Sequence, residues 1–251
     1  MHEADRPAGS DSRDRGVSVK TTICILVYGN HVDLARRSIG SVIEKLERSK
    51  YRLIVGANAI GGETSLYIYG LKAAGKIDEI LDANPANWGK YRMMQAMFSE
   101  VQTPYVWWMD DDSYVTDEYA LVRREMAADK APAETVAWGH VFFFSGSGEF
   151  SYGEDVETFV KSAPWYKGHP IPSGVLKIIP GWPRDRWFFP TGGCWFARME
   201  ALKILQWPDK RMTKRNDDVI LAEAIRQQGW SFEDIGPAGC VINGAARRGG
   251  W

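Results

Sequence analysis

Residues 105–112 read YVWWMDDD, a run of bulky apolar side chains that leads directly into three aspartates. A short apolar run of this kind is typical of a β-strand buried on both faces of a sheet. Apolar segments at 21–27, 51–57 and 79–83 predict three further strands before it. Segments with helical periodicity separate these strands, so we expect a parallel sheet.

Three helices are expected between the four strands. The first follows Gly29, the second spans 65–75 and ends at Gly75, and the third spans 90–100. The apolar side chains on the inward faces of the first and third helices are Leu34, Ile39, Val42, Ile43 and Leu46, and Met93, Met94, Met97 and Phe98. The alternation predicts an α/β fold with helices on both faces of a mainly parallel sheet.

The second half of the chain has a less regular pattern. We expect a strand over 135–144, a strand, a Gly-Gly turn and another strand over 187–197, and a helix over 216–229. Two short strand candidates follow that helix. Residues 145–186 are rich in Gly, Pro, Ser and Trp and show no clear period.

Composition restricts the class of protein. The net charge is −1, so bulk charge gives no sign of a nucleic-acid partner. No apolar run approaches the roughly 18 residues of a membrane span, and the first residues lack the apolar core of a secretory signal. The three cysteines lie far apart without a CxxC pair, which argues against a zinc site or a disulfide framework and favours a reducing, cytoplasmic location. No P-loop or GxGxxG motif occurs, so an ATPase or an NAD enzyme is not expected.

The aspartate cluster 110–112 follows a predicted strand at the edge where parallel sheets bind ligands. We expect it to converge there on one cleft with the residues that leave the ends of the other strands, Tyr28, Gly29, Asn30 and Asn58. Adjacent carboxylates repel one another, and hard cations such as Mg²⁺ or Mn²⁺ relieve that repulsion. The alternative is a solvated acidic turn that caps the next helix. The position directly after YVWWM favours the metal site, with Asp110 and Asp112 projecting to the same side.

Five segments together resemble a known family. These are ICILVYGN, NWGKYRMMQAM, YVWWMDDD, FPTGGCWFAR and NDDVILAEAIRQQGW, in that order over roughly residues 20–245. The succession resembles a GT-A-type (Rossmann-like) glycosyltransferase of family 2. Residues 1–19 are polar and charged and contain Gly, Pro and Ser, so we expect a disordered arm there. The resemblance implies a single GT-A domain at 20–251. Within it, 20–117 would bind the nucleotide-sugar, 118–245 the acceptor, and 246–251 would form a basic tail.

The resemblance implies roles on the donor side. Donor binding would fall to Val27, Tyr28, Gly29, Asn58, Lys90, Asp110, Asp111, Arg247 and Arg248. Asn58 stands where relatives usually carry an aspartate that binds uracil. An amide can still read a uracil edge, because it both donates and accepts hydrogen bonds. Asp112 is the expected metal ligand, together with Asp110.

On the acceptor side, the resemblance places the catalytic base in the acidic pair that opens the predicted helix, with Asp218 preferred over Asp217. The alternative is that these residues only cap the helix. Gly192 and Gly193 would bring backbone close to the acceptor, and Trp195 would stack on a sugar; the alternatives are a hairpin turn and a core tryptophan. Relatives often supply a late histidine ligand. Here the nearest substitute is Asn243.

The expected activity is transfer of a sugar from a nucleoside-diphosphate donor, with UDP-linked sugars preferred, to an acceptor hydroxyl. The resemblance implies inversion and a Mn²⁺ or Mg²⁺ cofactor. A nucleotidyltransferase on a similar sheet, a non-catalytic carbohydrate-binding module suggested by the 11 tryptophans, and a degenerate family member are the alternatives. The acceptor, whether a glycan, a lipid-linked sugar or a small molecule, stays open, as does the oligomeric state.

Overall fold

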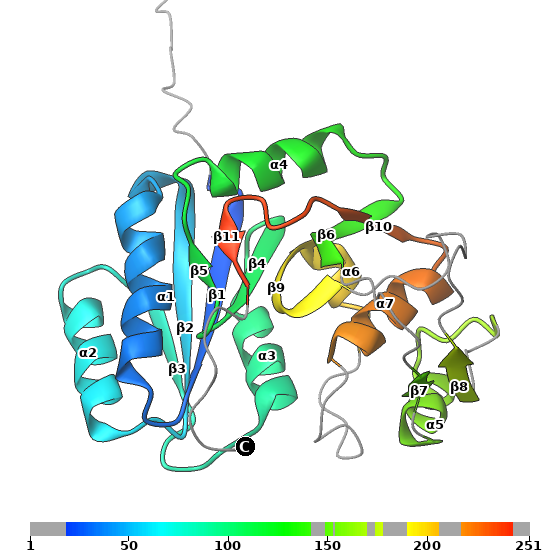
Figure 1. Ribbon diagram of the computed structural model, residues 1–251, viewed down its shortest axis with the longest axis horizontal. Coiled ribbons are helices and arrows are strands. Elements are labelled where there is room, and N and C mark those ends of the chain that lie inside the picture. The colour runs from blue at the N-terminus through cyan, green and yellow to red at the C-terminus, as the bar shows by residue number, and fades with distance from the viewer. Residues whose placement is uncertain are drawn as a thin grey trace, which may run out of the picture.

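A computed structural model describes residues 19–141, 149–152, 154–169, 174–177, 190–205 and 217–242. Its centre is a seven-stranded sheet in the order β10-β6-β9-β4-β1-β2-β3 (Figure 1). The strands of this sheet are β1 (Thr21–Tyr28), β2 (Tyr51–Asn58), β3 (Glu79–Asp82), β4 (Tyr105–Asp110), β6 (Thr135–Val141), β9 (Pro190–Arg198) and β10 (Ser231–Asp234).

The amino-terminal half of the sheet is parallel, as the sequence predicts. β1 pairs in parallel with both β2 and β4, and β2 pairs in parallel with β3. β9 runs antiparallel to β4 on one side and to β6 on the other. The mixed, mainly parallel α/β sheet expected from the sequence is therefore confirmed.

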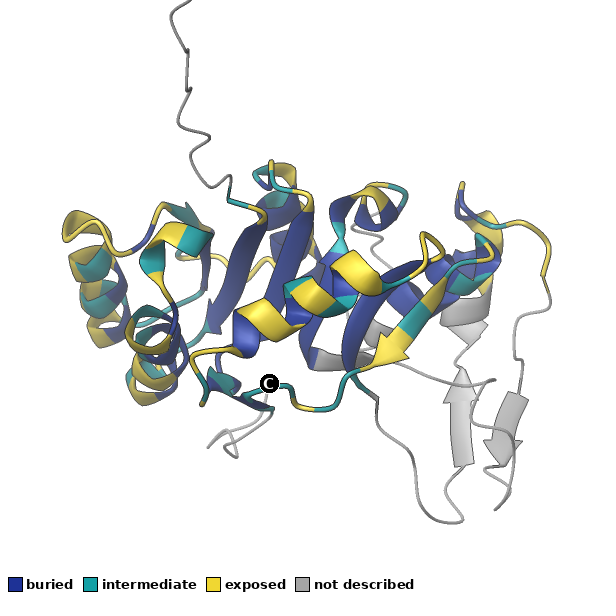
Figure 2. Cartoon of the chain, turned by 90° about the horizontal axis from the view of Figure 1, so that it is seen from above, coloured by how far each residue is buried: buried dark blue, intermediate teal, exposed yellow. Residues whose placement is uncertain are grey.

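Helices cover both faces of the sheet (Figures 1 and 2). α1 (Val32–Lys45), α2 (Gly62–Ala73) and α4 (Ala120–Lys130) pack on one face. α3 (Lys90–Ser99), α5 (Glu154–Ser162), α6 (Met199–Leu202) and α7 (Asp217–Gln227) contribute to the core on the other. The inward face predicted for α3 is confirmed, because Met93, Met94 and Met97 are fully buried. α1, α3 and α4 thus each bury one stripe of side chains and leave the opposite side in solvent.

Smaller elements complete the described part of the chain. β5 (Tyr114–Val115) follows the acidic cluster and pairs in antiparallel fashion with β11 (Cys240–Val241). β7 (Glu149–Tyr152) pairs with β8 (Gly174–Lys177), and a 3₁₀ turn (Arg48–Lys50) leads into β2.

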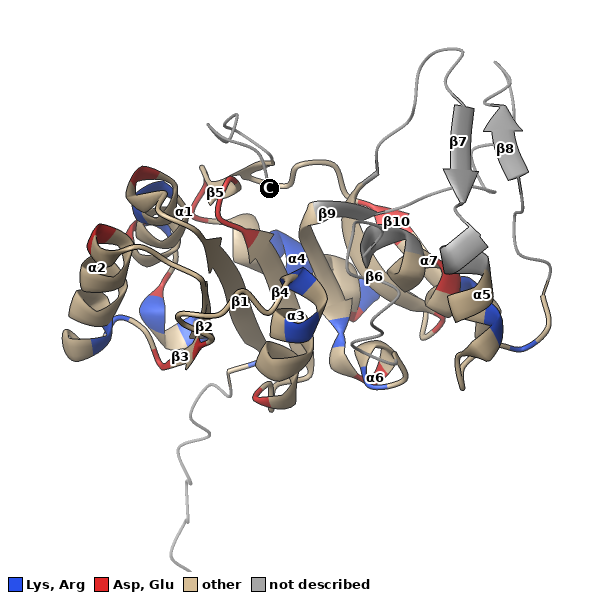
Figure 3. Cartoon of the chain, turned by 90° about the horizontal axis from the view of Figure 1, so that it is seen from below, with Lys and Arg blue, Asp and Glu red and all other residues tan. Residues whose placement is uncertain are grey.

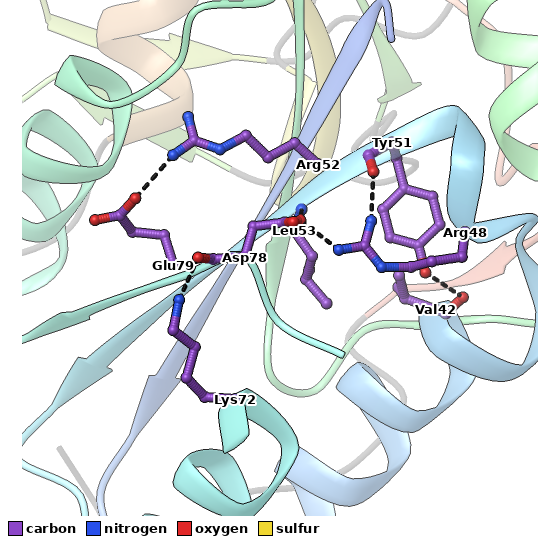
Figure 4. Close-up of polar contacts among 8 residues, drawn as sticks. All are labelled: Val42, Arg48, Tyr51, Arg52, Leu53, Lys72, Asp78 and Glu79. Atoms are coloured by element: carbon purple, nitrogen blue, oxygen red, sulfur yellow. Dashed lines mark hydrogen bonds and ion pairs between the residues drawn. The ribbon is translucent and has the colours of Figure 1, made fainter. Parts of the chain in front are cut away.

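A cluster of ion pairs fastens the amino ends of β2 and β3 (Figure 4). Arg48 Nη2 lies 2.7 Å from Asp78 Oδ2, and Arg52 Nη2 lies 2.8 Å from Glu79 Oε2. Asp78 also accepts a hydrogen bond from the Leu53 amide at 2.6 Å. These charged groups stabilise the amino ends of the two strands. Other polar groups lie at the carboxyl ends of the sheet strands.

One sequence prediction about the second half is wrong. The Gly-Gly turn expected within 187–197 does not form, because β9 continues through Gly192 and Gly193. It pairs with a strand on each side, and the register against β6 is irregular between Gly139 and Val141. Glycines in a strand interior often mark such an irregularity. The segment 145–186, without a clear period in the sequence, contains α5 and the pair β7 and β8.

Candidate functional site

Loops at the carboxyl ends of β1, β2 and β4 meet at one edge of the sheet. The Tyr28 amide donates a hydrogen bond to Asp111 Oδ2 at 3.2 Å. The Gly29 amide donates to the Asn58 carbonyl at 3.4 Å. Gly29 has a φ of +65°, a conformation that glycine adopts without strain. These contacts confirm the predicted convergence of the three strand ends.

Two asparagines connect β2 to the tyrosine at the end of β1. Asn58 Nδ2 donates to Asn87 Oδ1 at 2.9 Å, and Asn87 Nδ2 donates to the Tyr28 hydroxyl at 3.3 Å. Asn58 Oδ1 accepts a hydrogen bond from the Trp88 amide at 2.8 Å. Only 2% of Asn58 is exposed. This geometry favours a role for Asn58 in positioning the loop. It does not favour the predicted contact of Asn58 with a base.

Asn87 is a residue that the sequence interpretation missed. Its side chain bonds Asn58 and Tyr28 and also accepts a hydrogen bond from the Gly89 amide at 2.8 Å. The signal was present, since Asn87 begins the Asn-x-Gly segment from which only Lys90 was selected. Gly89 has a φ of +76° and leads the chain into α3.

Acidic residues, red in Figure 3, lie at the carboxyl end of β4. The three aspartates there, Asp110, Asp111 and Asp112, have different surroundings. Asp110 Oδ2 lies 2.9 Å from Lys90 Nζ, and Asp110 Oδ1 accepts a hydrogen bond from Trp108 Nε1 at 3.1 Å. Asp111 is 1% exposed and accepts from the Tyr28 amide, whereas Asp112 is only half-buried. Lys90, for which donor binding is predicted, lies beside this cluster and pairs with a carboxylate, which relieves part of the repulsion among these aspartates.

This arrangement restricts where a cation fits. Among the described residues, no three His, Cys, Asp or Glu side chains are grouped as a metal site. The ammonium of Lys90 beside Asp110 opposes a second cation there, so the geometry does not favour Asp110 as a metal ligand. Asp112 is the more exposed carboxylate and fits a site in which a bound diphosphate supplies further oxygen ligands.

The residues predicted to bind an acceptor lie in or near the core. Trp195 is 2% exposed and stacks on Trp108, with ring centroids 6.1 Å apart and planes 20° from parallel. Its ring is enclosed by neighbouring side chains, so this geometry favours the alternative of a core tryptophan over the predicted stacking on a sugar. Gly193 is buried, and its carbonyl accepts a hydrogen bond from Ser113 Oγ at 3.0 Å, which ties β9 to the acidic loop. Gly192 lies in β9.

The remaining predicted residues are described only in part. α7 begins at Asp217, which confirms a helix within 216–229. The side chains of Asp217 and Asp218 lie outside what the structure describes, and so do Asn243, Arg247 and Arg248. Val27 is fully buried in β1, so only its backbone can face a ligand at that strand end.

The mixed sheet, with polar loops gathered at the carboxyl ends of β1, β2 and β4, defines a GT-A fold. The model of glycosyl transferase family 2 matches residues 22–205. The chain belongs to this family.

Solved glycosyltransferase structures share the fold. The mannosyltransferase PcManGT from Pyrobaculum calidifontis, solved with GDP-Man and Mn²⁺, has a TM-score of 0.59 at 14% identity, over 89% of this chain and 56% of that one. Residues 1–349 of TarS from S. aureus give a TM-score of 0.53 at 10% identity, over 83% of this chain and 56% of that one. The same protein with UDP-GlcNAc gives 0.50 at 11% identity, over 82% and 53%. The chain thus spans little more than half the length of these relatives. A search of the curated proteins found no match.

Proposed function

We propose that the chain transfers a sugar from a nucleoside-diphosphate donor to an acceptor hydroxyl. The observation that carries the proposal is the meeting of Tyr28, the asparagine pair and the aspartate cluster at the carboxyl ends of three parallel strands. Ligands bind at this edge in open parallel sheets. The membership of family 2 and the nucleotide-sugars in the named relatives support the same class of donor.

In the proposed donor complex, Tyr28 and Gly29 lie against the base and Asp111 holds the backbone of that turn. Asp110 is kept in place by Lys90 and Trp108, so it is suited to accept a hydrogen bond from a ribose hydroxyl. The relatives carry either a guanine or a uracil nucleotide. UDP-sugars stay our first expectation, and GDP-sugars are the necessary comparison.

We further propose that Asp112 contributes to a Mn²⁺ or Mg²⁺ site. The ion would stabilise the negative charge that develops on the diphosphate leaving group. Arg247 and Arg248, on the basic tail, are proposed to contact the same phosphates.

On the acceptor side, Asp218 is proposed as the base that removes the proton of the attacking hydroxyl, with Asp217 as second choice. The acceptor oxygen then bonds to the anomeric carbon while the bond to the diphosphate breaks. A single displacement of this kind inverts the anomeric configuration. Inversion and the identity of the base rest on the family resemblance.

Calorimetric titration of UDP, GDP and dTDP, with Mn²⁺ and again with EDTA, tests donor binding. We expect one nucleotide to bind in a metal-dependent manner. Asp112→Asn should abolish the metal dependence, and Asp218→Asn should retain binding and lose transfer. Glu44→Gln is the matched control, because Glu44 is an exposed carboxylate near the end of α1 remote from the site.

The same titration, together with an assay of the reaction products, separates the alternatives. A nucleotidyltransferase would release pyrophosphate from a nucleoside triphosphate and a sugar phosphate. A carbohydrate-binding module would bind glycans without metal and ignore nucleotides. If Asp112→Asn and Asp218→Asn both transferred sugar as the wild type does, the assignment of a metal-dependent glycosyltransferase would be wrong.

Among the residues that the structure describes, no helix combines the length and apolar character needed to cross a membrane. We retain a cytoplasmic location as a proposal, supported by the three cysteines, all of which are free thiols.

A further inference from the structure

A buried arginine lies beneath the sheet, away from the donor site. Arg124 of α4 is 3% exposed. Its Nη1 donates to the carbonyls of Ala120 at 2.8 Å and Ala238 at 2.7 Å, and its guanidinium carbon lies 4.0 Å from the Trp107 ring centroid. Among the described residues, its hydrogen-bond acceptors are carbonyl oxygens and sulfurs, and none is a carboxylate. A buried positive charge without a carboxylate partner is costly, so it favours negative charge on its neighbours.

The neighbours are two sulfur atoms. Arg124 Nη2 lies 3.4 Å from Cys240 Sγ and 4.0 Å from Cys194 Sγ. Trp107 Nε1 also donates to Cys194 Sγ, at 3.3 Å. Cys194 lies in β9 and Cys240 in β11, yet both sulfurs lie within 4.0 Å of the same guanidinium nitrogen. The fold therefore brings together two cysteines that are 46 positions apart in the sequence.

The environment makes the two sulfurs unequal. The hydrogen bond from Cys240, the charge of Arg124 and the indole N–H together lower the pKa of Cys194 below that of an ordinary thiol, although burial opposes this. The pKa of Cys240 is raised, because it donates to Cys194 and is buried. Cys24 is the contrast, since burial without a thiol partner raises its pKa. The geometry points the same way, because the Trp107 indole N–H and the Arg124 guanidinium both face Cys194 Sγ. Cys194 is therefore the nucleophilic sulfur of the pair and Cys240 the resolving one.

We propose that Cys194 and Cys240 form an oxidant-sensitive thiol pair, which a hydroperoxide converts into a disulfide between β9 and β11. The Cys194 thiolate attacks one peroxide oxygen, so an S–O bond forms, the O–O bond breaks and hydroxide leaves. The Cys240 sulfur then attacks Cys194 Sγ, so the S–S bond forms, the S–O bond breaks and a second hydroxide leaves. Each of the two hydroxides takes up one thiol proton and becomes water. Two thiols lose two electrons, and one peroxide is reduced to two waters.

We expect a small oxidant to reach the two sulfurs when the pairing of β11 opens locally. β11 has only two residues and pairs with the equally short β5. So short a pairing opens at little cost in free energy and exposes the adjacent sulfurs.

The disulfide would join β9 and β11, two strands that lie next to the loop of the aspartate cluster. Gly193, next to Cys194, accepts the hydrogen bond from Ser113, and Cys240 pairs with Val115 of β5. Oxidation therefore links β9 covalently to β11. Each of these strands contacts the segment that follows the aspartates. The inference does not depend on sugar transfer, because its readout is the state of the thiols.

The test uses the full, reduced chain treated with limiting hydrogen peroxide, then alkylated and analysed by intact mass and peptide mapping. We expect a monomer that lacks two hydrogen atoms, a cross-linked peptide joining Cys194 to Cys240, and Cys24 still alkylated after unfolding. Before oxidation, native Cys194 should be alkylated at least about tenfold faster than Cys24.

Two variants make the result specific. Cys240→Ser should prevent the bridge and leave Cys194 as a sulfenic or sulfinic acid, whereas Cys24→Ser should leave the bridge unchanged. Three intact thiols under peroxide that oxidises free glutathione, a bridge that involves Cys24, or bridges only between chains would each overturn the proposal.

Discussion

Replacing Asn87 by alanine tests whether the asparagine pair holds the proposed base-binding turn. The change removes the acceptor of the buried Asn58 Nδ2 at 2.9 Å, together with the hydrogen bonds to Gly89 and Tyr28. A buried donor without a partner costs about 1–3 kcal/mol. Asn87 itself is exposed, so water replaces the other two bonds at little cost. We expect a loss of about 2 kcal/mol in the free energy of unfolding.

For a chain of this size, that loss corresponds to a decrease in Tm of about 4–8 °C, measurable by calorimetry. Nucleotide affinity should fall about fivefold, the equivalent of about 1 kcal/mol, because the Tyr28 hydroxyl loses its orienting partner. Titration of the preferred nucleotide measures this second effect.

Asn87→Asp is the matched control. A carboxylate still accepts from Asn58 and from the Gly89 amide, so the Tm should change by less than about 2 °C. The reasoning is refuted if Asn87→Ala is as stable as the wild type, or if the alanine and aspartate variants lose equal stability.

Three further outcomes are expected. Trp195→Ala should lower the free energy of unfolding by about 3–5 kcal/mol in urea titrations, because it empties a core position. Gly56→Ala should lower it by about 1–3 kcal/mol, since a new Cβ would lie 2.5 Å from Met97 Sδ. Lys20→Met should cost less than about 1 kcal/mol at neutral pH, because the ion pair with Asp129 is half exposed. That pair lowers the pKa of Asp129 below 3.8, so the difference between wild type and variant should be complete above pH 3.8, shrink as the pH falls further and vanish once Asp129 is protonated in the folded protein. Unfolding at several pH values measures this difference.

The parallel half of the fold was predictable because each element carries its own signal. β1, β2 and β4 are apolar runs buried on both faces, and α3 places its methionines on one side. The polar residues at the strand ends follow from the same alternation, since parallel strands end at a shared edge. The convergence of Tyr28, Asn58 and the aspartates was therefore correct.

What the sequence did not predict depends on contacts between distant segments. Burial of Trp195 follows from its stacking on Trp108, a partner 87 positions earlier in the chain. A Gly-Gly pair favours a turn when only its neighbours in the sequence are considered. The chain stays extended through Gly192 and Gly193 because β9 pairs with a strand on each side. Likewise, the role of Asn87 arises from Asn58, which lies in another element. Local patterns carry no information about such partners.

The position of β9 has a consequence for how the protein is synthesised. It fits between β4 and β6, although both precede it in the chain. While the chain emerges from the ribosome, β4 can pair with β1 and still has one open edge until residues 190–198 arrive. An open edge beside apolar surface invites pairing with other chains. Truncated chains that end before β9 should therefore aggregate, and a pause in translation just before it would prolong that hazard.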